Sequence, residues 1–228
     1  MDILILGDFH GCFEAAATAY TDVCRMHGIP DLLIQVGDYG YFPDSFPSSP
    51  WSLKLRHAAY FIDGNHDDHI ALRSLQKGEL VHGSWEYMPR GTIRGGILYI
   101  GGARSVDARH RTRGLDWWPE ENISQKEQDA ILNAINAYQA DTVNEPIHTI
   151  ITHDAPGGVD VSEACVYTGK EIIDGNRKFL QHILDMVGPK RWFFGHYHKH
   201  MEGVYRGCEW RCIDMVRKDA LDYVYFSV

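Results

Sequence analysis

Short apolar runs recur along the chain, and five of them lead directly into polar residues. These runs cover residues 3–6, 32–36, 60–62, 147–151 and 192–194. Each run has the length of a buried strand, and the Gly, Asp or Asn that follows it suits a tight exit turn. Open α/β sheets place their ligand sites at the carboxyl ends of strands, so the pattern predicts a site where these runs end.

Hydrophobic residues at helical spacing predict three helices between and after the apolar runs. The first apolar face extends from Phe13 to Cys24, and Gly28 supplies a stop signal. A second helix is expected after the capping-box sequence at residues 124–127. A third apolar face covers residues 177–187.

Further strand-like segments complete the pattern at residues 97–100, 204–205, 210–213 and 223–228. Strands that alternate with helices, followed by more strands, predict two packed sheets flanked by helices. We therefore expect an α/β fold, a four-layer α/β/β/α sandwich with two mixed sheets. No repeat, low-complexity tract or linker divides the sequence, so residues 1–228 are expected to form a single domain.

Three longer stretches fit no regular element, namely residues 39–52, 103–122 and 154–175. Loops of this length in a compact domain are usually functional or disordered. Their aromatic and basic residues favour a function.

The composition is that of an ordinary globular protein, with 44% hydrophobic and 23% charged residues. A formal net charge of -9 opposes broad binding to nucleic acid. This charge is compatible with a small anionic substrate, because bound cations would reverse the local electric field at a cluster of carboxylates.

The chain shows no apolar stretch near the ~20 residues that a membrane helix needs, and no signal-peptide pattern. Its five cysteines are odd in number and lack C-x-x-C spacing, which argues against a disulfide framework or a zinc ribbon. We therefore expect a cytoplasmic protein with reduced thiols and no membrane partner.

The polar clusters after the apolar runs contain residue types that bind metals. They are Gly7-Asp8-Phe9-His10-Gly11, Gly37-Asp38, Gly64-Asn65-His66-Asp67, Thr152-His153-Asp154 and Gly195-His196-Tyr197-His198. Taken alone, Gly37-Asp38 fits a simple turn, and Asp8 with His10 fits an ordinary loop equally well. His196 and His198 flank one residue at a strand end, so both imidazoles can point to one side and bind a metal.

In their order along the chain, these clusters resemble the signature of the calcineurin-like metallophosphoesterase family, in particular its compact bacterial and phage members. The resemblance implies Asp8, His10 and His198 as ligands of one metal ion, Asn65, His153 and His196 as ligands of the other, and Asp38 as the bridging carboxylate. Ions ~3.5–4 Å apart repel one another, and an anionic bridge offsets that repulsion. Mixed imidazole and oxygen ligands suit Mn, Fe, Zn or Ni, and the native pair stays open.

The resemblance also implies a mechanism in which a hydroxide that bridges two metal ions attacks phosphorus in line with the leaving oxygen. His66 matches the family residue that contacts the phosphate and can protonate the leaving group. Asp67 is a candidate to orient His66, as carboxylates orient other catalytic imidazoles. Asn65 and His66 are thus expected to contact substrate as well.

Substrate recognition is expected in the glycine-rich turn after residues 97–100 and in the basic stretch that follows. Arg104 is the favoured substrate contact because it lies nearest the strand end. The stretch also carries Arg109, His110, Arg111, Arg113, Trp117 and Trp118. Guanidinium groups suit phosphate and indoles can stack on a base, although a solvated basic loop over packed tryptophans explains the pattern equally well.

The sequence as a whole predicts a dinuclear-metal phosphoesterase that acts on a small phosphoester, with a phosphodiesterase for nucleotide-like substrates as the leading hypothesis. A phosphomonoesterase is the alternative within the same class. The acidic charge disfavours a nuclease that acts on polymers, and the complete ligand set disfavours a metal-binding scaffold without catalysis. In protein serine/threonine phosphatases an arginine follows the aspartate that corresponds to Asp38, whereas Tyr39 follows it here. This difference argues against protein phosphatase activity.

Overall fold

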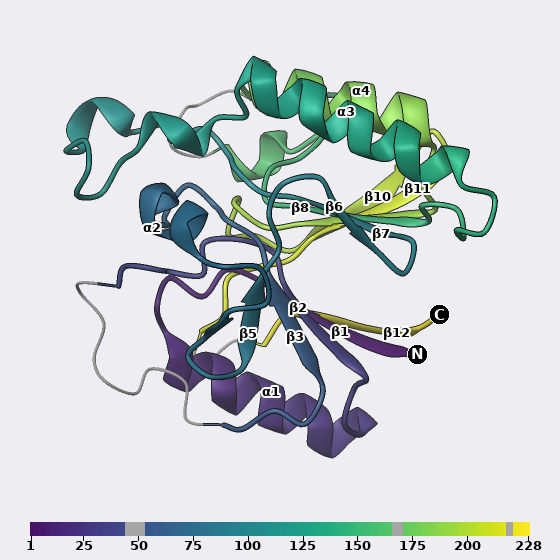
Figure 1. Ribbon diagram of the computed structural model, residues 1–228. Coiled ribbons are helices and arrows are strands. Elements are labelled where there is room, and N and C mark those ends of the chain that lie inside the picture. Colours follow the sequence, from purple (N-terminus) through teal and green to yellow (C-terminus); the bar gives the residue numbers. More distant parts are fainter. Residues whose placement is uncertain (44–52, 166–170, 218–220) are drawn as a thin grey trace.

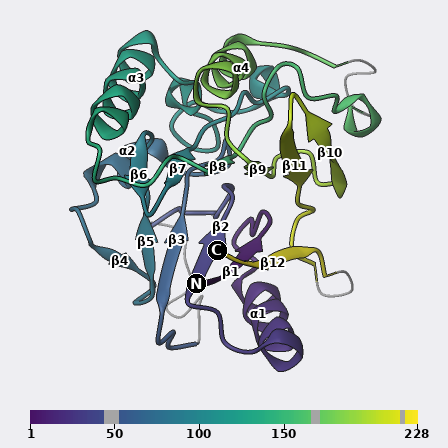
Figure 2. The same cartoon turned by 90° about the vertical axis from the view of Figure 1, so that its right-hand side faces the viewer.

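Two mixed sheets of six strands each stack face to face between helices in the computed structural model, which describes residues 1–43, 53–165, 171–217 and 221–228 (Figure 1). Helix α1 covers the outer face of one sheet, and helices α3 and α4 cover the outer face of the other (Figures 1 and 2). The expected four-layer sandwich is thereby confirmed.

The first sheet has the strand order β12-β1-β2-β3-β5-β4. Its strands are β1 (Asp2–Leu6), β2 (Leu32–Gln35), β3 (Ala58–Phe61), β4 (Leu80–Val81), β5 (Trp85–Tyr87) and β12 (Tyr223–Ser227). Strands β1, β2, β3 and β5 are parallel, and β12 and β4 add antiparallel edges. The pairing of β1 with β12 brings the two chain ends together, at the opposite end of the sheet from the carboxyl ends of the parallel strands (Figure 1).

The second sheet has the strand order β10-β11-β9-β8-β7-β6. Its strands are β6 (Thr92–Arg94), β7 (Ile97–Ile100), β8 (Thr149–Thr152), β9 (Arg191–Phe194), β10 (Met201–Tyr205) and β11 (Cys208–Cys212). Strands β7, β8, β9 and β11 are parallel, with β6 and β10 antiparallel at the two edges. Each sheet thus has a parallel centre, whose carboxyl ends can share one site.

The described residues form four α-helices, α1 (Phe13–His27), α2 (His69–Ser74), α3 (Gln125–Ala140) and α4 (Gly175–Val187). The predicted capping box is present, with Ser124 and Glu127 bonded to one another's backbone amides. Helix α4 begins at the side-chain cap of Asp174 and ends at Gly188, whose φ of 60° places it in the left-handed region. None of the described helices has the length and apolarity to span a membrane.

Alternation along β1 shows how the core divides into layers. Ile3 and Ile5 face the other sheet, while Leu4 and Leu6 pack toward α1. All four side chains are fully buried, which explains why the run reads as continuously apolar rather than alternating. The second sheet repeats the arrangement, with Ile151 between the sheets and Ile150 among the residues packed under the helices.

Four short elements were not predicted from the sequence, namely α2, β4, β5 and β6. Within the stretches expected to be irregular, the described residues form three short 3₁₀ helices, at Ala108–His110, Pro119–Glu121 and Ser162–Ala164. Residues 44–52 and 166–170 of those stretches lie outside the described part of the chain.

A buried ion pair joins the end of β3 to the segment after β5. The carboxylate of Asp63 accepts hydrogen bonds from Nε and Nη2 of Arg90 at 3.0 and 2.6 Å. Arg90 also donates to the backbone carbonyls of Glu120, Glu121 and Asn122. Burial opposes the ionisation of Asp63, but Arg90 and His69 outweigh it and hold the pKa of the Asp63 carboxyl far below its usual value.

Replacement of Arg90 by methionine is expected to lower the free energy of unfolding by about 3–5 kcal/mol at pH 7, because the buried charge of Asp63 loses its guanidinium partner and keeps only His69 and Tyr87. Since Asp63 has a depressed folded-state pKa, the stability that the pair contributes is complete above pH ~4 and falls as the pH drops below that value. Urea unfolding at pH 7 and pH 3 measures both effects. Arg25→Met, which breaks an exposed pair with Asp22, is the control and should cost less than about 1 kcal/mol.

Candidate metal centre

The polar clusters of the sequence meet where the parallel strands of both sheets end. Asp8 follows β1, Asp38 follows β2 and Asn65 follows β3, all from the first sheet. His153 follows β8 directly, and His196 lies two residues beyond β9 in the second sheet. Because both sheets contribute, the predicted site lies across the junction of the two halves of the chain.

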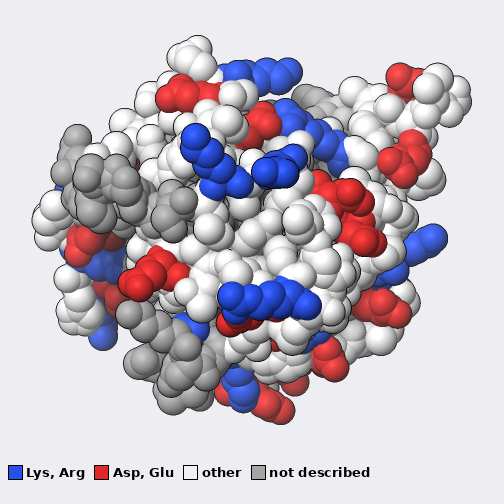
Figure 3. All heavy atoms as spheres, turned by 90° about the horizontal axis from the view of Figure 1, so that it is seen from below, with Lys and Arg blue, Asp and Glu red and all other residues white. Residues whose placement is uncertain are grey.

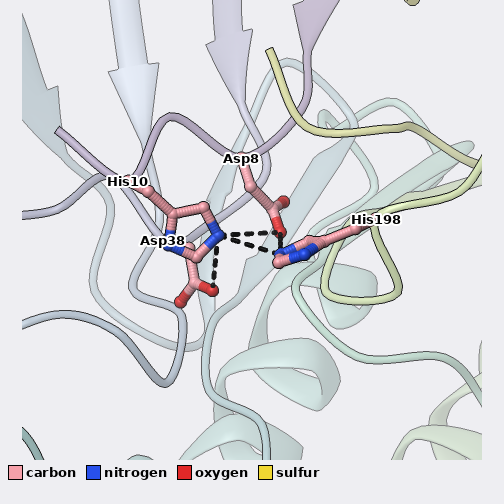
Figure 4. Close-up of side chains that lie close together, drawn as sticks. All are labelled: Asp8, His10, Asp38 and His198. Atoms are coloured by element: carbon pink, nitrogen blue, oxygen red, sulfur yellow. Dashed lines mark hydrogen bonds and ion pairs between the residues drawn. The ribbon is translucent and has the colours of Figure 1, made fainter. Parts of the chain in front are cut away.

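Four of the expected ligands form one compact group. Asp8, His10, Asp38 and His198 each offer a donor atom within 4.8 Å of the others, and Figure 4 shows their side chains pointing toward one another. His198 Nε2 lies 3.2 Å from Asp8 Oδ2, and His10 Nε2 lies 3.5 Å from Asp38 Oδ2. The two Nε2 atoms are 2.9 Å apart. Imidazole nitrogens and carboxylate oxygens that share so small a space form a donor set for a transition-metal ion.

A second group lies on the other side of Asp38. His153 Nε2 is 3.3 Å from Asp38 Oδ1 and 3.3 Å from Asn65 Oδ1. The ring of His196 is centred 5.0 Å from that of His153, and its backbone amide donates to Asp8. Asp38 therefore directs one oxygen toward each group, as a bridging carboxylate must.

The electrostatics of the second group favour a cation. Although burial works against it, the Asp38 carboxylate raises the pKa of His153 to about 10, and the pKa of Asp38 itself is well below its usual range. Burial and the neighbouring His153 lower the pKa of His196 to about 3, which keeps this imidazole in the neutral form that binds metals. A metal ion would displace the proton of His153.

Asp38 also supplies the test of whether a metal pair fits. Its Oδ2 atom is buried and has no hydrogen-bond partner among the described residues. A buried carboxylate oxygen without a partner is costly, and a bound cation would satisfy it. The donor set and this orphaned oxygen together fit two transition-metal ions held by Asp8, His10, Asp38, Asn65, His153, His196 and His198.

Four of these seven residues have a backbone conformation that residues other than glycine rarely adopt. His10, Asp38, His196 and His198 have φ values of 46°, 53°, 69° and 48°. Only two other non-glycine residues in the described part of the chain have positive φ. Such conformations cost of order 1–3 kcal/mol each and cluster at functional sites. The strain turns neighbouring side chains of a short loop toward a single point.

Glycine precedes several ligands because another ligand occupies the space of its missing side chain. A Cβ atom on Gly37, whose φ is 102°, would fall on the ring of His153. A Cβ atom on Gly64 would fall on the carboxylate of Asp38. These glycines permit the close approach of residues from different strands.

The structure places His66 beside the candidate metal ligands. Its backbone amide donates to Asp38 Oδ1 at 2.7 Å, and its ring is centred 5.0 Å from that of His10. Asp67 accepts hydrogen bonds from the backbone amides of Gly40, Tyr41 and Gly64. Among the described residues, no hydrogen bond joins its carboxylate to the His66 ring, so the contacts of Asp67 order the loop that carries His66 rather than the imidazole itself.

Ser105 and Glu121, which the sequence reasoning missed, orient Asn65. The Nδ2 of Asn65 donates to Ser105 Oγ at 3.1 Å, and that hydroxyl donates to Glu121 Oε2 at 2.6 Å. All three side chains are buried. Because Nδ2 is held in this way, Oδ1 of Asn65 faces His153 and the metal centre.

Ser105→Ala is expected to weaken binding of the ion that Asn65 helps to hold roughly 10- to 100-fold, the usual effect of removing a partner of a ligand. Competition titration of the apoprotein with Mn²⁺ and a chelating dye measures this. The control is Ser124→Ala, which removes the cap of α3 and should lower stability by about 1 kcal/mol without changing metal affinity. Equal affinity in Ser105→Ala and the unmodified protein would contradict the role of Ser105.

The two arginines nearest the site lie on different sides of it. Arg104 is exposed and lines a small cavity together with His196, Tyr197 and Asp174. Arg111, which the sequence did not single out from its neighbours, contacts the ring of His66 at 2.9 and 3.1 Å. No sequence signal distinguishes Arg111 from Arg109 or Arg113.

Comparison with solved structures shows the same fold in distant relatives. TT1561 of Thermus thermophilus superposes with a TM-score of 0.58 at 15% identity, over 94% of this chain and 89% of that one. A second is GAP50, the anchor in the inner membrane complex of Plasmodium, with a TM-score of 0.56 at 10% identity, over 93% of this chain and 70% of that one. A search of curated protein sequences found no match.

The family model for calcineurin-like phosphoesterases matches residues 1–200, a span that contains every candidate ligand. This match and the two-sheet architecture agree with the donor groups found at the strand ends. The chain therefore belongs to the calcineurin-like phosphoesterase family of metal-dependent phosphoesterases.

Proposed function

We propose that this protein is a phosphodiesterase that hydrolyses small, nucleotide-like phosphodiesters with two transition-metal ions, drawn from Mn, Fe, Zn and Ni. The observation that carries the proposal is Asp38, whose two carboxylate oxygens face two separate groups of histidine and oxygen donors. When bound, such ions supply Lewis acidity and generate a nucleophile at neutral pH.

The remaining steps fall to side chains of the chain itself. Asn65 and His66 are placed to contact the phosphoryl group, and His66 can donate a proton to the leaving oxygen. Asp67, through the backbone amides that it holds, keeps the loop of both residues in place. Arg104 is exposed and lines a small cavity beside His196, from which it can contact the substrate.

The test compares two chromogenic esters on apoprotein reconstituted with Mn²⁺. We expect kcat/KM for bis(p-nitrophenyl) phosphate to exceed that for p-nitrophenyl phosphate, and activity to vanish when a chelator removes the metal. The opposite preference would establish the phosphomonoesterase alternative. Repeating the assay with Fe²⁺, Zn²⁺ and Ni²⁺ identifies the metals that support turnover.

A metal-binding scaffold without catalysis is the main alternative from another class, and GAP50, an anchor by its description, has a similar fold. Fold similarity at 10% identity does not distinguish an enzyme from a scaffold, so a measurement of activity is needed to separate them. A full load of metal without turnover of any ester would favour the scaffold.

Polymeric nucleic acid is a disfavoured substrate. On the face shown in Figure 3, acidic and basic side chains of the described residues are interspersed, and no broad basic patch is present among them. Competition of ester hydrolysis by a single-stranded oligonucleotide at several salt concentrations tests this, since binding to a polymer weakens steeply with salt.

All five cysteines are free, which supports our proposal that the protein acts in the cytoplasm.

A further inference from the structure

The guanidinium of Arg111 lies against the imidazole of His66. Its two terminal nitrogens are 3.1 and 2.9 Å from the two ring nitrogens. On its other side, Nε forms an ion pair with Asp107 Oδ1 at 2.8 Å. The Arg111 side chain is only 11% exposed, so it is held in this position rather than extended into solvent.

His66 cannot satisfy both terminal nitrogens of Arg111. A neutral imidazole has one acceptor nitrogen, whereas a guanidinium has five N–H donors. Asp107 takes the Nε donor, and the carbonyl of Asp116 accepts from Nη1 at 3.3 Å. Donors of Arg111 therefore remain beside His66, where a group with several acceptor oxygens would fit.

A structured turn directs Arg111 toward the site. Asp116 and Leu115 donate backbone hydrogen bonds to the carbonyl of Thr112, and Gly114 donates to that of Trp117 at 2.9 Å. In contrast, the neighbouring arginines at 109 and 113 are exposed. One arginine of this basic stretch is thus singled out by its contacts.

The charges around Arg111 point to an anion. His66 lies next to His10, one of the candidate metal ligands, and two divalent ions would carry more positive charge than Asp8 and Asp38 neutralise. Asp107 offsets the charge of Arg111 on the side away from His66, and an anion on the His66 side would be attracted both by Arg111 and by the bound ions. The planar fork of a guanidinium matches two oxygens of a phosphoryl group.

From these contacts we infer that Arg111 is a substrate-binding residue, which donates hydrogen bonds to the non-bridging oxygens of the phosphoryl group that His66 and the metal centre act on. The inference rests on the proposed function for the identity of the substrate. It assigns a specific role to residues 103–122, because Ser105 of the same stretch orients Asn65. One loop would then contact both Asn65 and His66.

The experiment measures inorganic phosphate binding to the Mn²⁺-loaded full chain by isothermal titration calorimetry, with metal content determined for every variant. Loss of a charge-assisted contact in Arg111→Gln should weaken phosphate binding about 10- to 100-fold. Arg111→Lys keeps the positive charge but loses the planar guanidinium, so its affinity for phosphate should lie between those of Arg111→Gln and the unmodified protein. Arg113→Gln is the matched control and should bind phosphate within twofold of the unmodified protein.

The measurements separate this inference from the proposed function. If the unmodified protein binds phosphate but hydrolyses no ester, the proposed function fails and the comparison of Arg111 variants still decides the inference. Unchanged phosphate affinity in Arg111→Gln, absence of phosphate binding in the unmodified protein, or loss of metal from Arg111→Gln would each overturn it. With turnover present, kcat/KM for bis(p-nitrophenyl) phosphate should fall in parallel with phosphate affinity.

Discussion

Replacing Asp38 with alanine is expected to leave the purified protein without its metal pair and to lower turnover by at least about 10³-fold. The carboxylate of Asp38 reaches both groups of donors, so in the proposed centre its loss removes a ligand from each ion and the charge that offsets their repulsion. Several kcal/mol of charge stabilisation disappear with the metals, and each 1.36 kcal/mol corresponds to a tenfold change in rate.

Metal analysis and steady-state kinetics with bis(p-nitrophenyl) phosphate test this expectation. The backbone amide of His66 also loses its acceptor in Asp38→Ala, so a second variant separates folding from binding. Asp38→Asn keeps the shape of the side chain and one acceptor oxygen, but removes the charge and replaces the other oxygen by an NH2 donor. If Asp38→Asn held two ions per chain and turned over normally, the bridging role would be wrong.

His66→Ala should produce a different result, in which both metal ions stay bound and turnover falls by about 10²–10⁴-fold, the usual contribution of a positioned proton donor. The His66 ring lies beside the candidate ligands, and its link to Asp38 runs through the backbone, which alanine retains. The loss should be larger for an ester with a poor leaving group, such as a methyl ester, than for a p-nitrophenyl ester that needs little protonation.

Comparing the two leaving groups makes the role of His66 testable. Equal losses for both esters would show that His66 does not donate the proton, and an empty metal site in His66→Ala would make it a ligand. His200→Ala is the matched control, because this partly exposed histidine, just before β10, contacts Asp222 and should leave activity unchanged.

The strand ends were predictable because strand pattern and chemistry coincide there. Each apolar run is largely buried and leads into its ligand within a few residues, as β8 does with His153. The short elements α2, β4, β5 and β6 left no comparable signal, since none of them is a continuous apolar run that leads into a cluster of candidate ligands.

The supporting contacts of the site could not be predicted in the same way. Asn65 meets Ser105 across 40 positions of sequence, and His66 meets Arg111 across 45. No periodicity or spacing rule connects such pairs, because they depend on how a loop folds over the sheet. Asp67 shows the converse, since its neighbour in sequence is His66 but its hydrogen bonds go to Gly40, Tyr41 and Gly64.

The division of the ligands between the two sheets has a consequence for the evolution of this protein. Residues such as Ile5 and Ile151, packed between the sheets, set how far apart the two halves of the metal centre stand. Close-packed interiors transmit changes of volume, so a mutation there can alter catalysis without touching any catalytic group. Selection for activity should therefore constrain this middle layer more tightly than the layers under the helices, and adaptive mutations in it should depend on one another.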